Sequence, residues 1–156
     1  MRPTGACFCG AVRYRLTARP MFVHCCHCRD CQRQTGSAFA INALIETANV
    51  EILSGRPEIF TLKTDSGRPH DVYRCSVCLS ALWSDYGRRG VLSFLRVATL
   101  DDPGQFPPDV HIFARSKLPW VRLPENTRAF DVYYDMAKEW PAESLKRREA
   151  LLGPGK

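Results

Sequence analysis

The stretch Cys25-Cys26-His27-Cys28-Arg29-Asp30-Cys31 holds half of the eight cysteines of the chain. Two shorter motifs lie on either side of it, Cys7-Phe8-Cys9 and Cys75-Ser76-Val77-Cys78. Cysteines one or two residues apart can direct both sulfurs at one metal ion, because a tight turn brings the thiolates to the Zn–S distance of about 2.3 Å. Ordinary disulfide geometry fits such close pairs poorly. The three motifs therefore predict metal binding.

The number of cysteines in each motif predicts two kinds of metal centre. A closed structural zinc site takes four protein ligands, whereas a reactive site keeps three and leaves the fourth position open. The two flanking pairs supply four cysteines, namely Cys7, Cys9, Cys75 and Cys78. The central stretch supplies three, Cys26, Cys28 and Cys31. We expect one closed zinc site, which ties together segments 75 − 9 = 66 residues apart, and one open site.

Two other uses of the central stretch stay open from the residues alone. Cys25 or a histidine could complete a second closed zinc site. Alternatively, Cys25, Cys28 and Cys31 have the C-x2-C-x2-C spacing of some iron–sulfur centres, although the C-x3-C-P continuation of the common ferredoxin run is missing. Outside these alternatives we expect Cys25 to be an inert or accessory thiol.

Length and composition indicate one packed domain over residues 1–156. The chain is 45% hydrophobic and 24% charged, which excludes a disordered protein. Its net charge of +6 is compatible with an anionic partner, but the basic residues are scattered. The one compact run, Lys146-Arg147-Arg148, is expected on the solvated face of a helix. Without basic stretches interleaved with aromatic residues, the sequence disfavours nucleic-acid binding.

The amino-terminal segment predicts a soluble cytoplasmic protein. It has no apolar core of a signal peptide, and the longest apolar-looking stretch, residues 37–45, is far shorter than the roughly 20 residues of a membrane helix. In a reducing compartment, cysteine clusters bind metals or act in catalysis more often than they form disulfides.

Short runs of β-branched and aromatic residues between turn signals predict a mainly antiparallel β domain. We expect strands over residues 11–17, 38–45, 50–53, 58–63, 70–74, 91–100 and 110–114. A short helix is expected after Cys28, up to Gly36. A carboxyl-terminal helix is expected to begin at Pro141, to stop at Gly153 and to turn three leucines inward, Leu145, Leu151 and Leu152.

The joint pattern resembles the glutathione-dependent formaldehyde-activating enzyme family, a superfamily that also includes centromere protein V. The resemblance runs from about Gly5 to Trp120 and leaves residues 121–156 as an extension. It is carried by the motifs Cys7-Phe8-Cys9-Gly10-Ala11-Val12-Arg13-Tyr14, Cys26-His27-Cys28-Arg29-Asp30-Cys31, Gly36-Ser37-Ala38-Phe39, Cys75-Ser76-Val77-Cys78 and His111-Ile112-Phe113-Ala114-Arg115-Ser116-Lys117-Leu118-Pro119-Trp120. Leu79 departs from the family pattern, which usually has glycine there. Because leucine resists positive φ, we expect the turn beyond Cys78 to differ locally.

The resemblance implies an antiparallel, zinc-bearing β-tent with two zinc ions. It assigns a structural zinc to Cys7, Cys9, Cys75 and Cys78, and a catalytic zinc to Cys26, Cys28 and Cys31. The implied activity is the condensation of formaldehyde with glutathione to S-(hydroxymethyl)glutathione, a carbon–sulfur lyase reaction in reverse.

Zinc with three thiolates would lower the pKa of an entering thiol, such as glutathione or its aldehyde adduct, for attack on an aldehyde carbon. The positive net charge suits a tripeptide with two carboxylates. The alternative from another class is a zinc-stabilised binding module with two structural zincs and no catalysis.

Several further residues near the motifs have weaker assignments. His27 and Arg29 are expected to orient the substrate or the thiolates by hydrogen bonds. The alternative is that His27 is a histidine of the turn and Arg29 a surface arginine. His24 is expected in a strand that enters the cluster, and His111 as a packed, hydrogen-bonded histidine. The three tryptophans are expected in the core: Trp83, Trp120 and Trp140.

Overall fold

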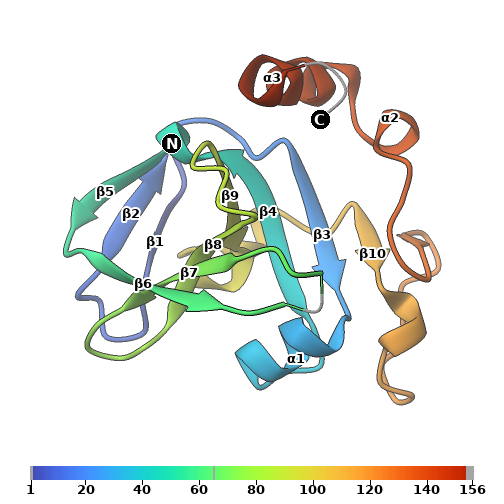
Figure 1. Ribbon diagram of the computed structural model, residues 1–156, viewed down its shortest axis with the longest axis horizontal. Coiled ribbons are helices and arrows are strands. Elements are labelled where there is room, and N and C mark those ends of the chain that lie inside the picture. Colours follow the sequence, from blue (N-terminus) through green and yellow to red (C-terminus); the bar gives the residue numbers. More distant parts are fainter. Residues whose placement is uncertain (1, 65, 154–156) are drawn as a thin grey trace.

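Two β-sheets of unequal size form the framework of the molecule (Figure 1). The computed structural model describes residues 2–64 and 66–153. The smaller sheet has the order β1–β2–β5, with β1 at Thr4–Ala6, β2 at Arg13–Leu16 and β5 at Val50–Ser54. The larger sheet has the order β11–β10–β3–β4–β9–β8–β7–β6. Its strands are β3 Phe22–Cys26, β4 Ala40–Glu46, β6 Pro57–Leu62, β7 His70–Cys75, β8 Ala81–Tyr86, β9 Leu92–Arg96, β10 Val110–Ile112 and β11 Arg128–Ala129.

Most neighbouring strands run antiparallel, so the expected mainly antiparallel β class is confirmed. At one edge of the larger sheet, β10 runs parallel to both β3 and β11. Three strands were not expected from the sequence: β1, β8 and β11. The strand β3 was expected only as a strand at His24, without bounds. The strand β3, Phe-Val-His-Cys-Cys, is buried along its whole length and has no alternation of polar and apolar residues to mark it.

The helices are short and lie at the two ends of the larger sheet (Figure 1). The helix α1 spans Arg29–Thr35 and ends at Gly36, whose φ of 63° is left-handed. The helices α2, Met136–Glu139, and α3, Ala142–Leu152, follow near the carboxyl end. Both helices expected from the sequence are therefore present. No helix in the described ranges is long and apolar enough to span a membrane.

The expectation of a solvated basic face on α3 is wrong for one residue of the run. Arg147 donates from Nη2 to Glu46 Oε2 at 2.6 Å and from both terminal nitrogens to the carbonyl oxygen of Arg19 at 3.0 Å. These bonds tie α3 to the end of β4 and to the segment before β3.

The larger sheet has apolar side chains on both faces, because alternate residues of a strand point in opposite directions. On one face Ala43 and Ile45 pack in a core cluster with Tyr14 and Trp83. The other face carries a second cluster, in which Leu44 joins Phe22 and Trp140. The three leucines of α3, Leu145, Leu151 and Leu152, pack against this second cluster as expected.

One tryptophan departs from the expected core position. Trp83 and Trp140 are buried, but Trp120 is 69% exposed. It follows Pro119 in an irregular segment beyond β10, where no strand or helix covers its ring.

Candidate metal centres

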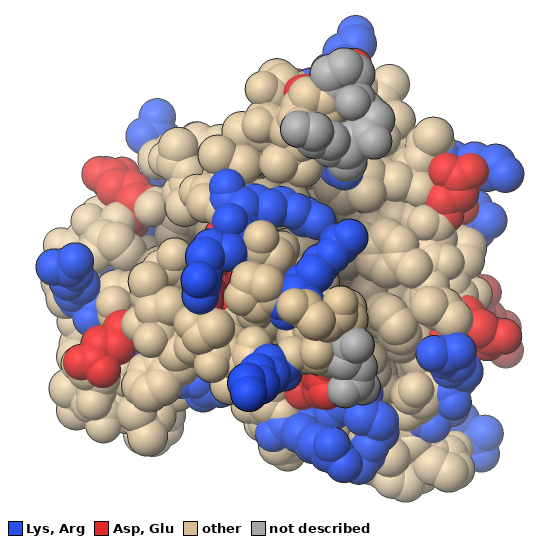
Figure 2. Space-filling model, in the orientation of Figure 1, with Lys and Arg blue, Asp and Glu red and all other residues tan. Residues whose placement is uncertain are grey.

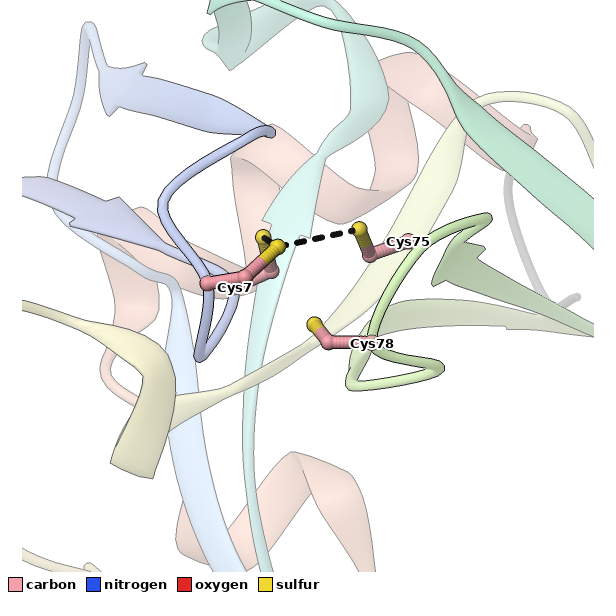
Figure 3. Close-up of side chains that lie close together, drawn as sticks. Cys7, Cys75 and Cys78 are labelled. Atoms are coloured by element: carbon pink, nitrogen blue, oxygen red, sulfur yellow. Dashed lines mark hydrogen bonds between the residues drawn. The ribbon is translucent and has the colours of Figure 1, made fainter.

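Four cysteines from two loops distant in the sequence meet at one point (Figure 3). Cys7 and Cys9 lie in the turn after β1, Cys75 ends β7, and Cys78 lies in the turn before β8. The four Sγ atoms lie within 4.8 Å of one another. Cys9 Sγ is 3.6 Å from Cys7 Sγ and 3.8 Å from Cys75 Sγ. A zinc ion with tetrahedral Zn–S bonds of about 2.3 Å separates its sulfur ligands by about 3.8 Å, whereas a disulfide separates them by about 2.05 Å. The first cysteine group therefore has the spacing of ligands to one zinc ion.

Hydrogen-bond donors lie against three of the four sulfurs of this first group. The backbone N–H of Val12 donates to Cys7 Sγ at 3.3 Å, and that of Val77 donates to Cys75 Sγ at 3.4 Å. Hydrogen bonds from the hydroxyl and backbone N–H of Ser80 lower the pKa of Cys78 to about 5. Because the thiolate is the form that binds metal, these bonds favour ligation.

The turn that carries Cys78 keeps a left-handed residue in spite of Leu79. The φ of Leu79 is 61°, so the expectation that leucine would change this turn is wrong. Its backbone N–H donates to the carbonyl oxygen of Cys75 at 3.0 Å, and its own carbonyl oxygen accepts from Arg74 Nη1 at 2.9 Å. The turn holds the leucine in a conformation that side chains ordinarily disfavour.

The second cysteine group forms where β3 passes into α1. Cys26 ends β3, Cys28 is the N-cap of α1, and Cys31 lies in the first turn of that helix. Their three Sγ atoms lie within 4.8 Å of one another. As the cap, Cys28 Sγ accepts from the backbone N–H of Cys31 at 3.4 Å. Helix capping therefore turns Cys28 toward the sulfur of the next turn.

The protonation of the second group shows that its donor set fits a cation. Hydrogen bonds from the Cys26 and Cys31 thiols lower the pKa of Cys28 to about 2, while those between Cys26 and its two neighbours raise the pKa of Cys26. One sulfur thus ionises at the expense of another, and three thiolates side by side need a positive charge to offset their repulsion. Three soft sulfur ligands suit Zn²⁺.

A buried arginine that sequence reasoning missed lies against the second group. Arg96 ends β9 and is 6% exposed. Its guanidinium donates to the side chains of Asn42 and Gln34. Burial lowers the pKa of Arg96, and attraction to the Cys31 and Cys26 sulfurs opposes that shift. In the sequence Arg96 appears as one basic residue at the end of an apolar run. Only the pairing of β4 with β9 places it beside the cysteines.

Cys25 lies apart from the second group. In the described part of the chain, Cys25 clusters with His27 and His111. The second cysteine group consists of Cys26, Cys28 and Cys31 without Cys25. Neither the closed site completed by Cys25 nor the iron–sulfur set on Cys25, Cys28 and Cys31 is assembled here.

His24 lies in β3 as expected, 2% exposed, and its ring nitrogens have no hydrogen-bond partner among the described residues. His111 is packed and hydrogen-bonded to His27, also as expected.

Two hollows flank α1. The larger has a volume of about 650 Å³. Its lining includes Arg29 of α1, Phe39 and the exposed Trp120. The smaller, of about 270 Å³, lies between α1 and the β6–β7 turn and is lined in part by Arg33, Lys63 and His70. Gln34 also lines the smaller hollow and accepts from Arg96, so this hollow leads toward the second cysteine group.

A β fold with one group of four cysteines and one group of three describes a class of proteins with two cysteine groups that could each hold a metal ion. Residues 2–116 match the family model of the glutathione-dependent formaldehyde-activating enzyme, and the chain belongs to that family. A Halomonas elongata protein whose name places it in the same family is 32% identical over 157 aligned positions, which cover 96% of this chain and 95% of the relative.

A solved structure of a Rhodobacter sphaeroides protein is similar with a TM-score of 0.48 and 18% identity. The similarity covers 81% of this chain and 99% of that one.

Proposed function

We propose that this protein is a zinc-dependent enzyme that adds glutathione to formaldehyde to form S-(hydroxymethyl)glutathione, and that it acts in the cytoplasm. Family membership supports the reaction class. One observation supports catalysis: among the described residues the second group has three sulfurs and no fourth cysteine, histidine or carboxylate. A three-ligand set leaves room for a substrate atom.

The two cysteine groups have different roles in this proposal. Cys7, Cys9, Cys75 and Cys78 hold a structural zinc that joins the two sheets. Cys26, Cys28 and Cys31 hold the catalytic zinc, which would lower the pKa of a thiol that enters the open position and so raise its thiolate fraction at neutral pH.

The addition is balanced without an oxidant or reductant. The lone pair of the thiolate sulfur forms the C–S bond, and the π electrons of the carbonyl move to oxygen. That oxygen takes up the proton that the thiol released. Arg96 offsets the negative charge of the second group, because three thiolates exceed the two positive charges of zinc by one.

The smaller hollow beside α1 suits the carboxylates of glutathione. Arg33 of α1 and Lys63 of the β6–β7 turn line it, and so does Asp30 of α1, which leaves two basic side chains and one acidic side chain among its lining residues. Lysine and arginine side chains gather on this face around α1 and that turn (Figure 2). Guanidinium and ammonium groups recognise carboxylates by charge-assisted hydrogen bonds. The hollow would hold the peptide while its sulfur reaches the second group.

The variant Cys28→Ser tests the catalytic assignment. It is expected to contain about one zinc equivalent less than the wild type and to lose glutathione binding, measured by elemental analysis and calorimetric titration. Thr35→Ala, an exposed change on the same helix, is the control and is expected to keep both. A Cys28→Ser protein with wild-type affinity for glutathione would refute the assignment and favour a binding module with two structural zincs.

A further inference from the structure

A third group of metal-binding side chains lies on the opposite face of β3 from the second cysteine group. We propose that Cys25, His27 and His111 bind a third ion, a zinc ion held by one sulfur and two nitrogens. The strand register and the distances of this group stand apart from the proposed function, whereas its charge argument rests on the zinc proposed for the second group.

The backbone brings these three residues together. In the parallel pair of β3 and β10, Cys25 and His111 are directly paired across the strands, and paired residues present their side chains on the same face. Cys26, the next residue of β3, points to the other face. His27 lies just past the strand, where its backbone N–H donates to the carbonyl oxygen of Ile112 at 3.0 Å. The register of β3 and β10 therefore places the third group and the second cysteine group on opposite faces of β3.

The distances within this third group match a zinc site. His27 Nε2 is 3.0 Å from His111 Nδ1 and 3.6 Å from Cys25 Sγ, and all three ligand atoms lie within 4.8 Å of one another. Tetrahedral bonds of about 2.0–2.1 Å to nitrogen and about 2.3 Å to sulfur separate two nitrogens by about 3.3 Å, and a nitrogen from a sulfur by about 3.6 Å. A small outward movement of one imidazole makes room for the ion.

Burial and charge favour the same assignment. The exposed fractions of Cys25, His27 and His111 are 1%, 0% and 7%, so water does not saturate their polar atoms. Zinc with one thiolate and two neutral imidazoles carries a net charge of +1, and the second group with its zinc carries −1. Two neighbouring centres of opposite charge stabilise each other in a buried setting.

The test is the number of zinc ions per chain. The full-length protein is loaded with zinc, dialysed against metal-free buffer and measured by elemental analysis. We expect three zinc ions in the wild type and two in Cys25→Ala and in His111→Ala. The control is His24→Asn, which removes a buried histidine from the same strand and is expected to retain three.

Two results would overturn the proposal: as many ions in Cys25→Ala as in the wild type, or an equal loss in the control. A wild type with two ions and a Cys25→Ala protein with one would instead count against the zinc proposed for the second group. If the variants do not fold, Co²⁺ gives the same answer in the wild type. A third equivalent of Co²⁺ must then add an absorption band of a nitrogen- and sulfur-bound centre, and its absence also overturns the proposal. The outcome of the Cys28→Ser experiment is separate from this test, because its deciding measurement is the affinity for glutathione.

Discussion

Single residues decide the chemistry of the second cysteine group, and Arg96 is the clearest case. Its guanidinium is held in place by Asn42 and Gln34 and faces the sulfurs of Cys26 and Cys31. A fixed positive charge at this point stabilises thiolates without occupying a ligand position. Residues that act on metal ligands in this way tune metal affinity as strongly as some ligands do.

We expect Arg96→Met to weaken zinc binding at the second group by about 10–100-fold, the usual effect of losing a partner of a metal ligand. A chelator competition measures this affinity. Arg96→Lys keeps the charge but not the planar set of donors, so it should lie between the wild type and Arg96→Met. Equal zinc affinities for all three proteins would show that Arg96 does not act on the metal ligands.

Leu79 is a second residue whose local conformation has an energetic consequence. A residue with a Cβ in the left-handed region loses about 1 kcal/mol relative to glycine. Leu79→Gly is therefore expected to raise the free energy of unfolding by about 1 kcal/mol, measured by urea denaturation of the zinc-loaded protein. Leu79→Ala removes the same exposed side chain but keeps the Cβ, and it should give no comparable gain.

At the scale of elements, α3 is attached to the sheet by a partly buried ion pair. Arg147 bonds to both carboxylate oxygens of Glu46, at 2.8 and 2.6 Å. Partial burial disfavours the ionised Glu46, but hydrogen bonds from Arg147 and from the backbone and Asn49 outweigh it, and the pKa falls below its ordinary value of 4.5. A carboxyl with a lowered pKa stabilises the folded state above its unfolded pKa and loses that contribution as the pH falls.

Arg147→Met is expected to lower the free energy of unfolding at pH 7 by about 1–2 kcal/mol. The difference from the wild type should shrink as the pH falls below 4.5 and through the lowered pKa of Glu46 in the folded wild type, because Glu46 then becomes protonated in both proteins. Urea denaturation at pH 7 and at lower pH measures both effects. Lys146→Met, an exposed change in the same helix, is the control, and a similar loss there would argue against the ion pair.

Elements also show where the sequence was informative. Helix α1 could be predicted because residues 29–34 contain no helix breaker before Gly36, and α3 because of its flanking Pro141 and Gly153. The bounds of the strand β3 could not, since burial on both faces removes the period of two. The cysteine groupings follow from local spacing, whereas Arg96 and His70, on β9 and β7, come near the second group and α1 only through long-range strand pairing.

At the scale of the whole molecule, the first cysteine group joins the smaller sheet to the larger one. Cys75→Ser removes one of four ligands at that junction and is expected to lower the midpoint of thermal unfolding by about 10 °C or more. Cys31→Ser is the matched comparison. It should have a smaller effect, because the second group joins residues of only one local segment. Equal midpoints would contradict a structural role for the first group.

The junction between Cys9 and Cys75 also bears on how the protein is made. A ribosome that adds about 5–20 residues per second needs about 3–13 s to travel from one of these cysteines to the other. During that interval the amino-terminal CxC motif exists without its partners, with two thiols open to oxidation or to capture of the wrong metal. If these four cysteines hold the proposed structural zinc, the cell has to supply zinc, or protect these thiols, while the chain is still being synthesised.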